Sequence, residues 1–126
     1  MKYYSEDHEW VEIIGDEAVI GLSEYAFDQE LEVLAVELPE EETDFIIGDK
    51  FVDVQLESGK NLELYCPISG TVIAVNELLQ DEPGQLLDTN EERCWICRLS
   101  NIDIDEVNDM MNEDAYFRYL RKLGKV

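Results

Sequence analysis

Short stretches of β-forming residues, each stopped by Gly, Pro, Asn or Asp, are the feature of this sequence that most restricts its fold. Runs of this length, bounded by turn residues, are typical of strands joined by hairpins. We therefore predict about seven short strands in a mainly β sandwich or barrel that carries small helices. The predicted strands cover residues 10–14, 18–22, 32–38, 45–47, 51–56, 62–66, 71–75 and 94–99.

Turn residues place the hairpins between these runs. Gly15-Asp16 and Gly48-Asp49 each separate two predicted strands, and residues 67–70 contain Pro and Gly. Residues 58–61, Ser-Gly-Lys-Asn, lie between the predicted strands 51–56 and 62–66. This segment is predicted to be a hairpin tip, and it carries Lys60.

Helical patterns are confined to short segments. Ser23 is predicted to cap a helix with Phe27 and Leu31 on one face, and Asn76 to cap a helix over residues 77–80. Apolar residues at helical spacing also occur within residues 104–123. Arg118, Arg121 and Lys122 lie near the C-terminal end of this segment, where the helix dipole favours cations.

The charge of the chain excludes several partners. Its 126 residues include 31 acidic and 9 basic ones, for a net charge of −22. Nucleic acids and anionic membranes need a basic surface, so neither is expected to bind. The charge favours basic patches of other proteins and disfavours self-association, so we predict a monomer. The length is that of one domain, covering residues 1–126.

No targeting or membrane segment is evident. No apolar run approaches the roughly 20 residues of a membrane span. Residues 1–7, Met-Lys-Tyr-Tyr-Ser-Glu-Asp, lack the apolar segment of a signal peptide. We therefore expect a cytoplasmic protein.

The residues of common active sites are scarce. His8 is the only histidine, so any nucleophilic triad would have to use it. We instead expect His8 to help position Trp10 at the start of the first strand. No phosphate-binding glycine motif is present, no pair of carboxylates stands out, and no metal site or catalytic residue is predicted.

The three cysteines do not suggest a disulfide framework, since their number is odd. Cys94 and Cys97 have the CxxC spacing of redox proteins, but they lie in a predicted strand. Residues three apart on a strand point to opposite faces, which makes a disulfide between them difficult. We expect both to be packing residues and Cys66 to be a buried small apolar side chain.

At several points the sequence resembles the glycine cleavage system H proteins, which are lipoyl carriers of the biotinyl/lipoyl-domain class. The resemblance covers about residues 2–121. It rests on residues 2–11 (KYYSEDHEWV), 21–26 (GLSEYA), 36–39 (VELP), 64–70 (LYCPISG) and 76–79 (NELL), on Trp95, and on residues 114–116 (DAY). It implies a barrel-sandwich hybrid with short helices and a C-terminal helical segment.

The resemblance also implies a function. Family members carry lipoate on one lysine and shuttle the aminomethyl group of glycine from glycine decarboxylase to aminomethyltransferase. Dihydrolipoamide dehydrogenase reoxidises the carrier, and a lipoyl ligase attaches the cofactor. The chain would then be a carrier subunit and not an enzyme, which suits its lack of catalytic residues.

Lys60 is the candidate for the lipoyl-lysine. The family pattern Glu-Ser-X-Lys matches Glu57, Ser58, Gly59 and Lys60, but Lys60 is one residue closer to Tyr65 than the family spacing requires. In one interpretation, Lys60 is lipoylated on a re-registered hairpin in which Gly59 takes a positive φ. In the other, Lys60 is an ordinary loop lysine.

Two further functions stay open. Without lipoate, the chain would be an acidic protein-binding module with the fold of the family. With lipoate, it could serve another complex, such as a sulfur-metabolising one. A second departure lies at Glu30-Leu31-Glu32, where the family has Leu-Gly-Asp, in a region that members use for partner contact.

Overall fold

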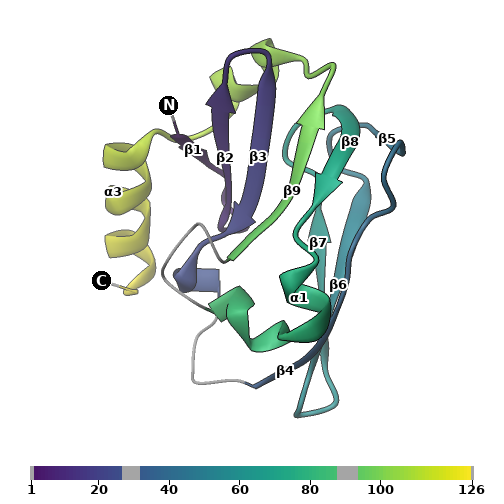
Figure 1. Ribbon diagram of the computed structural model, residues 1–126. Coiled ribbons are helices and arrows are strands. Elements are labelled where there is room, and N and C mark those ends of the chain that lie inside the picture. The colour runs from purple at the N-terminus through teal and green to yellow at the C-terminus, as the bar shows by residue number, and fades with distance from the viewer. Residues whose placement is uncertain (1, 27–31, 88–93, 126) are drawn as a thin grey trace.

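The computed structural model of the protein describes residues 2–26, 32–87 and 94–125 (Figure 1). Its strands pair in antiparallel fashion throughout and form two sheets, ordered β1-β2-β3-β9-β8-β5 and β4-β6-β7. This confirms the mainly β prediction. The strands are β1 (Lys2–Tyr4), β2 (Glu9–Ile14), β3 (Glu17–Leu22), β4 (Val33–Glu37), β5 (Asp44–Phe45), β6 (Lys50–Leu56), β7 (Asn61–Tyr65), β8 (Gly70–Val75) and β9 (Trp95–Ser100).

Short helical elements close the ends of the sheets. They are η1 (Glu24–Ala26), α1 (Leu78–Asp81), η2 (Pro83–Leu87), η3 (Ile104–Asp109) and α3 (Glu113–Leu123), of which the three η elements are 3₁₀ helices. Leu79 of α1 and Leu86 of η2 are buried against the core, and both elements contact β4. In the described part of the chain, no helix is both long enough and apolar enough to span a membrane.

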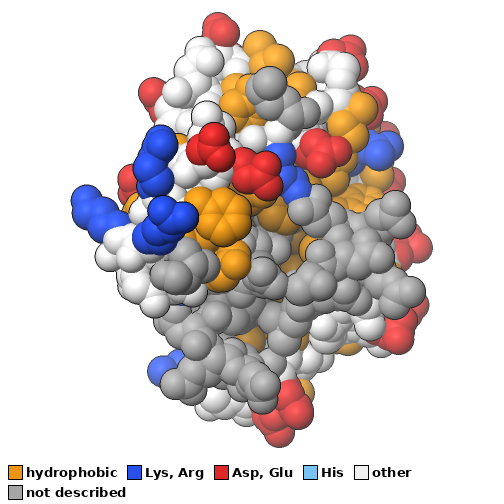
Figure 2. All heavy atoms as spheres, turned by 90° about the vertical axis from the view of Figure 1, so that its left-hand side faces the viewer, with side chains coloured by type: hydrophobic (Ala, Val, Ile, Leu, Met, Phe, Trp, Pro, Cys, Tyr) orange, Lys and Arg blue, Asp and Glu red, His pale blue; other side chains and the backbone are white. Residues whose placement is uncertain are grey.

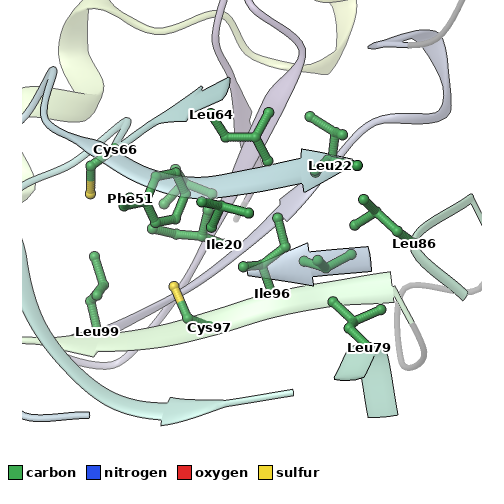
Figure 3. Close-up of a cluster of buried hydrophobic side chains, with 14 of the residues drawn as sticks. Ile20, Leu22, Phe51, Leu64, Cys66, Leu79, Leu86, Ile96, Cys97 and Leu99 are labelled. Atoms are coloured by element: carbon green, nitrogen blue, oxygen red, sulfur yellow. The ribbon is translucent and has the colours of Figure 1, made fainter. Parts of the chain in front are cut away.

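One hydrophobic core joins the two sheets (Figure 3). Ile20 and Ile96 come from the larger sheet, Val54 and Leu64 from the smaller one, and none is more than 2% exposed. Along β6, Val52, Val54 and Leu56 alternate with more exposed residues, as a strand with one buried face requires. Burial of alternate residues therefore sets the register of β6.

The predicted turns and caps are largely confirmed. Gly15 and Gly48 take positive φ angles of 63° and 92°. Ser23 Oγ accepts a hydrogen bond from Tyr25 N at 3.2 Å, and Asn76 Oδ1 accepts one from Leu78 N at 3.3 Å. The helix after Asn76 begins one residue later than predicted, with Glu77 as its N-cap. The predicted helical face of Phe27 and Leu31 lies outside the described residues.

Two parts of the fold differ from the sequence-based expectation. β1 is not predicted from the sequence, because it is too short for an alternating pattern, and of the predicted strand 45–47 only Phe45 lies in a strand, β5 (Asp44–Phe45). Residues 104–109 form a 3₁₀ helix, and Ile104 is 52% exposed although its spacing from Val107 suggested a shared apolar face. Only Val107 of this element is buried.

The C-terminal helix α3 packs on the N-terminal strand. Asn112 caps its start, and Gly124 ends it with a left-handed φ of 77°. The rings of Tyr4 and Tyr116 stack with centroids 4.2 Å apart. His8 contacts this helix: its Nδ1 lies 2.8 Å from Tyr116 Oη, which donates to Ser23 Oγ, so His8 links the segment before β2 to α3. Its expected role in positioning Trp10 stays a prediction.

Gly21 of β3 is required by the ring of Trp10 on the neighbouring strand. A Cβ atom at Gly21 would lie 2.1 Å from Trp10 Cζ2, and Trp10 is only 3% exposed. Because the ring is packed, it cannot swing away without opening the core.

We predict that Gly21→Ala lowers the free energy of unfolding by about 2 kcal/mol, because it overpacks this site. Urea denaturation measures the change. Gly84→Ala is the control, since a Cβ there meets nothing within 4 Å. Equal stability of the two variants would contradict the role given to Gly21.

Candidate functional site

The β6–β7 hairpin carries the lysine singled out by the sequence. Gly59 N donates to Leu56 O at 3.0 Å, and Leu56 N donates to Lys60 O at 2.9 Å. These bonds close a loop of residues 57–59 in which Gly59 has a φ of 89°, the geometry of a type I turn followed by a left-handed residue. The positive φ predicted for Gly59 is confirmed. Lys60 lies directly after the loop, opposite Leu56, and not within it.

The register of the hairpin decides which side of the sheet Lys60 occupies. Val54 pairs with Leu62, and Val52 pairs with Leu64. Since side chains alternate along a strand, Lys60 shares a side with Leu62 and Leu64, which is the core-facing side of the smaller sheet. Near the loop of the hairpin this side of the sheet is in contact with solvent, and Lys60 is exposed.

The Lys60 ammonium has no partner among the described residues, unlike those of Lys2 and Lys50. Within the described residues, no side-chain hydrogen bond or salt bridge holds Lys60. By contrast, Lys50 Nζ lies 2.9 Å from Asp53 Oδ2, and Lys2 Nζ lies 4.5 Å from the centroid of the Trp10 ring. Lys60 is therefore accessible to a modifying enzyme.

The loop residues that precede Lys60 are anchored to β4. Glu57 N donates to Glu32 O at 2.9 Å, and a hydrogen bond between the two side chains raises the pKa of the exposed Glu57 carboxyl. The three predicted neighbours of Lys60, namely Glu57, Ser58 and Gly59, thus make up the whole loop. Within the described residues, neither the Glu57 nor the Ser58 side chain forms a hydrogen bond or ion pair with the lysine.

Two hollows lie beside the strand that follows Lys60. The nearer one, of about 250 Å³, is lined by Leu62 and Leu64 of β7 and by Ala26. The larger one, of about 560 Å³, begins at Tyr65 and is also lined by Met110. Both hollows share the side chains of Glu6, Asp7, Glu9 and Tyr65. Their walls are therefore both apolar and acidic.

Glu9 is a buried acid shared by both hollows. It is 3% exposed; Ser5 Oγ donates to its Oε1 at 2.9 Å, and Tyr65 N lies 3.4 Å from its Oε2. Burial raises its pKa from 4.5 to about 7, because desolvation outweighs the hydrogen bond from Ser5. Sequence reasoning did not single out Glu9. The only signal was an acid directly before the apolar pair Trp10 and Val11.

A second carboxylate fixes the far wall of the larger hollow. Glu106 of η3 accepts hydrogen bonds from Ser69 N at 2.7 Å and Ser69 Oγ at 2.9 Å. Ser69 Oγ in turn accepts a bond from Ile47 N at 2.9 Å. Glu106 therefore ties η3 to the β7–β8 turn, and Ser69 ties that turn to the β5–β6 turn. Ile47 and Glu106 both line the hollow.

The cysteines have a packing role, as predicted. Cys66, Cys94 and Cys97 are all buried, and none forms a disulfide within the described residues. Burial raises the pKa of Cys66 to about 12 and that of Cys97 still higher, so neither is a ready nucleophile. No cluster of three or more potential metal ligands occurs among the residues that the structure describes.

Comparison with known proteins identifies relatives along nearly the whole chain. The family described as "Glycine cleavage H-protein" matches residues 2–123. The chain is 37% identical over 123 residues to glycine cleavage system H protein 4 of Aquifex aeolicus, covering 97% of this chain and 71% of that protein. It is 38% identical over 114 residues to the glycine cleavage system H protein of Staphylococcus carnosus, covering 90% and 89%.

A solved structure shows the same fold. The crystal structure of a glycine cleavage system H protein from Mycobacterium marinum superimposes with a TM-score of 0.80, at 22% sequence identity. The superposition covers 98% of this chain and 96% of that one. The barrel-sandwich architecture expected from the sequence is therefore confirmed.

Buried Glu9 makes the stability of the protein depend on pH. Between pH 4.5 and about 7 the folded state keeps a proton that the unfolded state releases, so ionisation favours unfolding as pH rises through this window. Relative to Glu9→Gln, the wild type should lose about 3 kcal/mol across it and then level off. Urea unfolding at a series of pH values measures the difference.

Ser5→Ala provides a matched variant for this prediction. Removing the Ser5 hydroxyl should raise the pKa of Glu9 further, because its hydrogen bond favours the ionised carboxylate. A constant difference between wild type and Glu9→Gln at all pH values would show that Glu9 ionises normally.

Proposed function

The chain belongs to the glycine cleavage H-protein family, and from this premise we propose that it is a lipoyl carrier whose lipoate is attached to Lys60. The observation that carries the proposal is the exposed, unpaired ammonium of Lys60 next to a three-residue hairpin loop. A ligase must reach the amine, and these features leave the amine free to attack the activated carbonyl of lipoate.

The residues around Lys60 fit the cofactor. Lys60 is one residue closer to Tyr65 than the family spacing requires. The left-handed conformation of Gly59, which ends the loop directly before Lys60, accommodates this difference. Lys60 keeps the Glu-Ser-X-Lys order of the family. Among the chain's five lysines, it is the only one on this hairpin loop or directly beside it.

The reaction served would be glycine cleavage. Lipoate supplies a disulfide that accepts the aminomethyl group derived from glycine, and the protein supplies presentation and recognition. The partners would be glycine decarboxylase, aminomethyltransferase and dihydrolipoamide dehydrogenase, together with the ligase. Attachment to one exposed residue raises the local concentration of the carried group at each partner.

We further propose that the two hollows receive the loaded arm. Lys60 lies on the same side of β7 as Leu62 and Leu64, which line the nearer hollow. Glu9 faces both hollows, and its carboxylate would attract an amine carried into them. Apolar walls at Leu62 and Met110 would bury the aliphatic part of the arm.

The attachment site is tested by mass spectrometry. After expression with a lipoyl ligase and lipoate, the wild type should gain the mass of one lipoyl group on its Lys60 peptide. Lys60→Arg should remain unmodified, because a guanidinium is not acylated by the ligase. The matched control Lys122→Arg, at an exposed lysine of α3, should be modified as the wild type is.

Two results would contradict the assignment. Lipoate that persists on Lys60→Arg would place the attachment elsewhere. A wild-type chain that stays unmodified, while another H protein is modified in the same cells, would favour the alternative of an acidic binding module without lipoate.

Docking of the loaded arm is tested through the titration of Glu9. A nearby ammonium stabilises a carboxylate, so loading with glycine and glycine decarboxylase should lower the pKa of Glu9 from about 7. Carbon-detected NMR of the Glu9 side chain, before and after loading, measures this shift. An unchanged Glu9 pKa in the loaded protein would exclude an amine bound beside it.

A further inference from the structure

Three cations on α3 have no partner among the described residues, in a chain that carries 31 acidic residues. Arg118, Arg121 and Lys122 are exposed, and none forms a salt bridge or side-chain hydrogen bond within the described residues. By contrast, Arg98 Nε lies 3.8 Å from Glu17 Oε1, and Lys125 Nζ donates to Tyr25 O at 3.0 Å.

These cations form one surface of the helix. Residues three and four apart on a helix are neighbours, so Arg118 adjoins both Arg121 and Lys122. Arg118 and Arg121 also line a hollow of about 490 Å³ together with Asp114 and Phe117, and the Phe117 ring is 45% exposed. Figure 2, which views the molecule from the side of α3, shows Lys and Arg side chains gathered on this face. We call Phe117, Arg118, Arg121 and Lys122 the α3 cationic surface.

The helix dipole explains only part of this pattern. Arg121 and Lys122 lie in the last turn, where cations are favoured. Arg118 lies one turn earlier, beside the exposed ring of Phe117, where the helix dipole does not stabilise it. An apolar ring flanked by two arginines is the kind of cluster that supplies anchors in protein interfaces.

We propose that the α3 cationic surface is a docking site for an acidic segment of another protein, which contributes carboxylates to Arg118 and Arg121 and an apolar side chain to Phe117. Arginine binds carboxylates in a bidentate manner, and free guanidinium groups can do so without breaking an internal salt bridge. This inference goes beyond the carrier function and does not depend on it.

Charge favours a protein over a nucleic acid at this site. Nucleic acids attract through long-range fields and several phosphate contacts, and a net charge of −22 opposes that approach. A short acidic peptide carries fewer charges than a nucleic acid, and screening beyond about 8 Å at physiological ionic strength limits its repulsion by the rest of the chain. An exposed phenylalanine also suits an apolar peptide side chain.

The α3 cationic surface is separate from the lipoyl-lysine candidate. In Figure 1, α3 lies on the left of the molecule and the tip of the β6–β7 hairpin lies at the bottom right. A partner held at α3 would therefore leave Lys60 uncovered. Failure of one proposal can thus be told from failure of the other by measuring lipoylation in the same variants.

The test is a binding titration with a defined probe. A fluorescein-labelled helical peptide with Glu and Leu at helical spacing is titrated with the full chain, and anisotropy reports binding. Arg121→Gln should weaken binding about fivefold, and Arg118→Gln/Arg121→Gln about tenfold or more. Arg98→Gln removes the same charge from β9 and should change the affinity by less than about twofold. Added salt should weaken wild-type binding.

The outcomes separate the alternatives. The proposal fails if the wild type does not bind the peptide, if Arg98→Gln weakens binding as much as Arg121→Gln, or if a copy of the peptide with Gln for Glu binds equally. Tighter binding of single-stranded DNA than of the peptide would assign the surface to nucleic acid instead. Circular dichroism confirms that each variant is folded.

Discussion

Burial of alternate side chains between the two sheets is the constraint on which the rest of the structure depends. It holds Val54 opposite Leu62 and Val52 opposite Leu64, so β6 and β7 cannot slip by one residue without exposing the core. β6 nevertheless carries one residue more than the segment opposite it, and the register shift between Lys50 and Val52 absorbs this residue. The position of Lys60 therefore follows from packing deep in the hairpin and not from its loop alone.

The same packing explains why an acid is buried beside the hairpin. Glu9 begins the strand that carries Trp10 and Val11, both buried, so its backbone is held in the interior. The carboxyl group is left with one hydroxyl and one distant amide as partners, which is too little to offset desolvation. A group whose pKa lies near neutrality is thereby placed at the junction of two hollows.

Much of the fold could be predicted from the sequence, and the features of the site that could not be predicted depend on contacts between distant parts of the chain. Strand positions and turn glycines follow from local patterns, as Gly15 and Gly59 show. The place of Lys60 outside the loop depends on cross-strand hydrogen bonds, which residue counting does not reveal. The partner of His8 is Tyr116, 108 residues away, and no local pattern could indicate it.

The pairing of the chain's two ends has a consequence for the order of folding. Tyr4 exchanges backbone hydrogen bonds with Met111, and both residues line the larger hollow. Contacts of such high sequence separation form late, because the intervening loop must close first. During synthesis, all residues of the β6–β7 hairpin leave the ribosome before residue 111, on which the larger hollow depends. The segment that bears the lysine is thus available before the cavity beside it is complete.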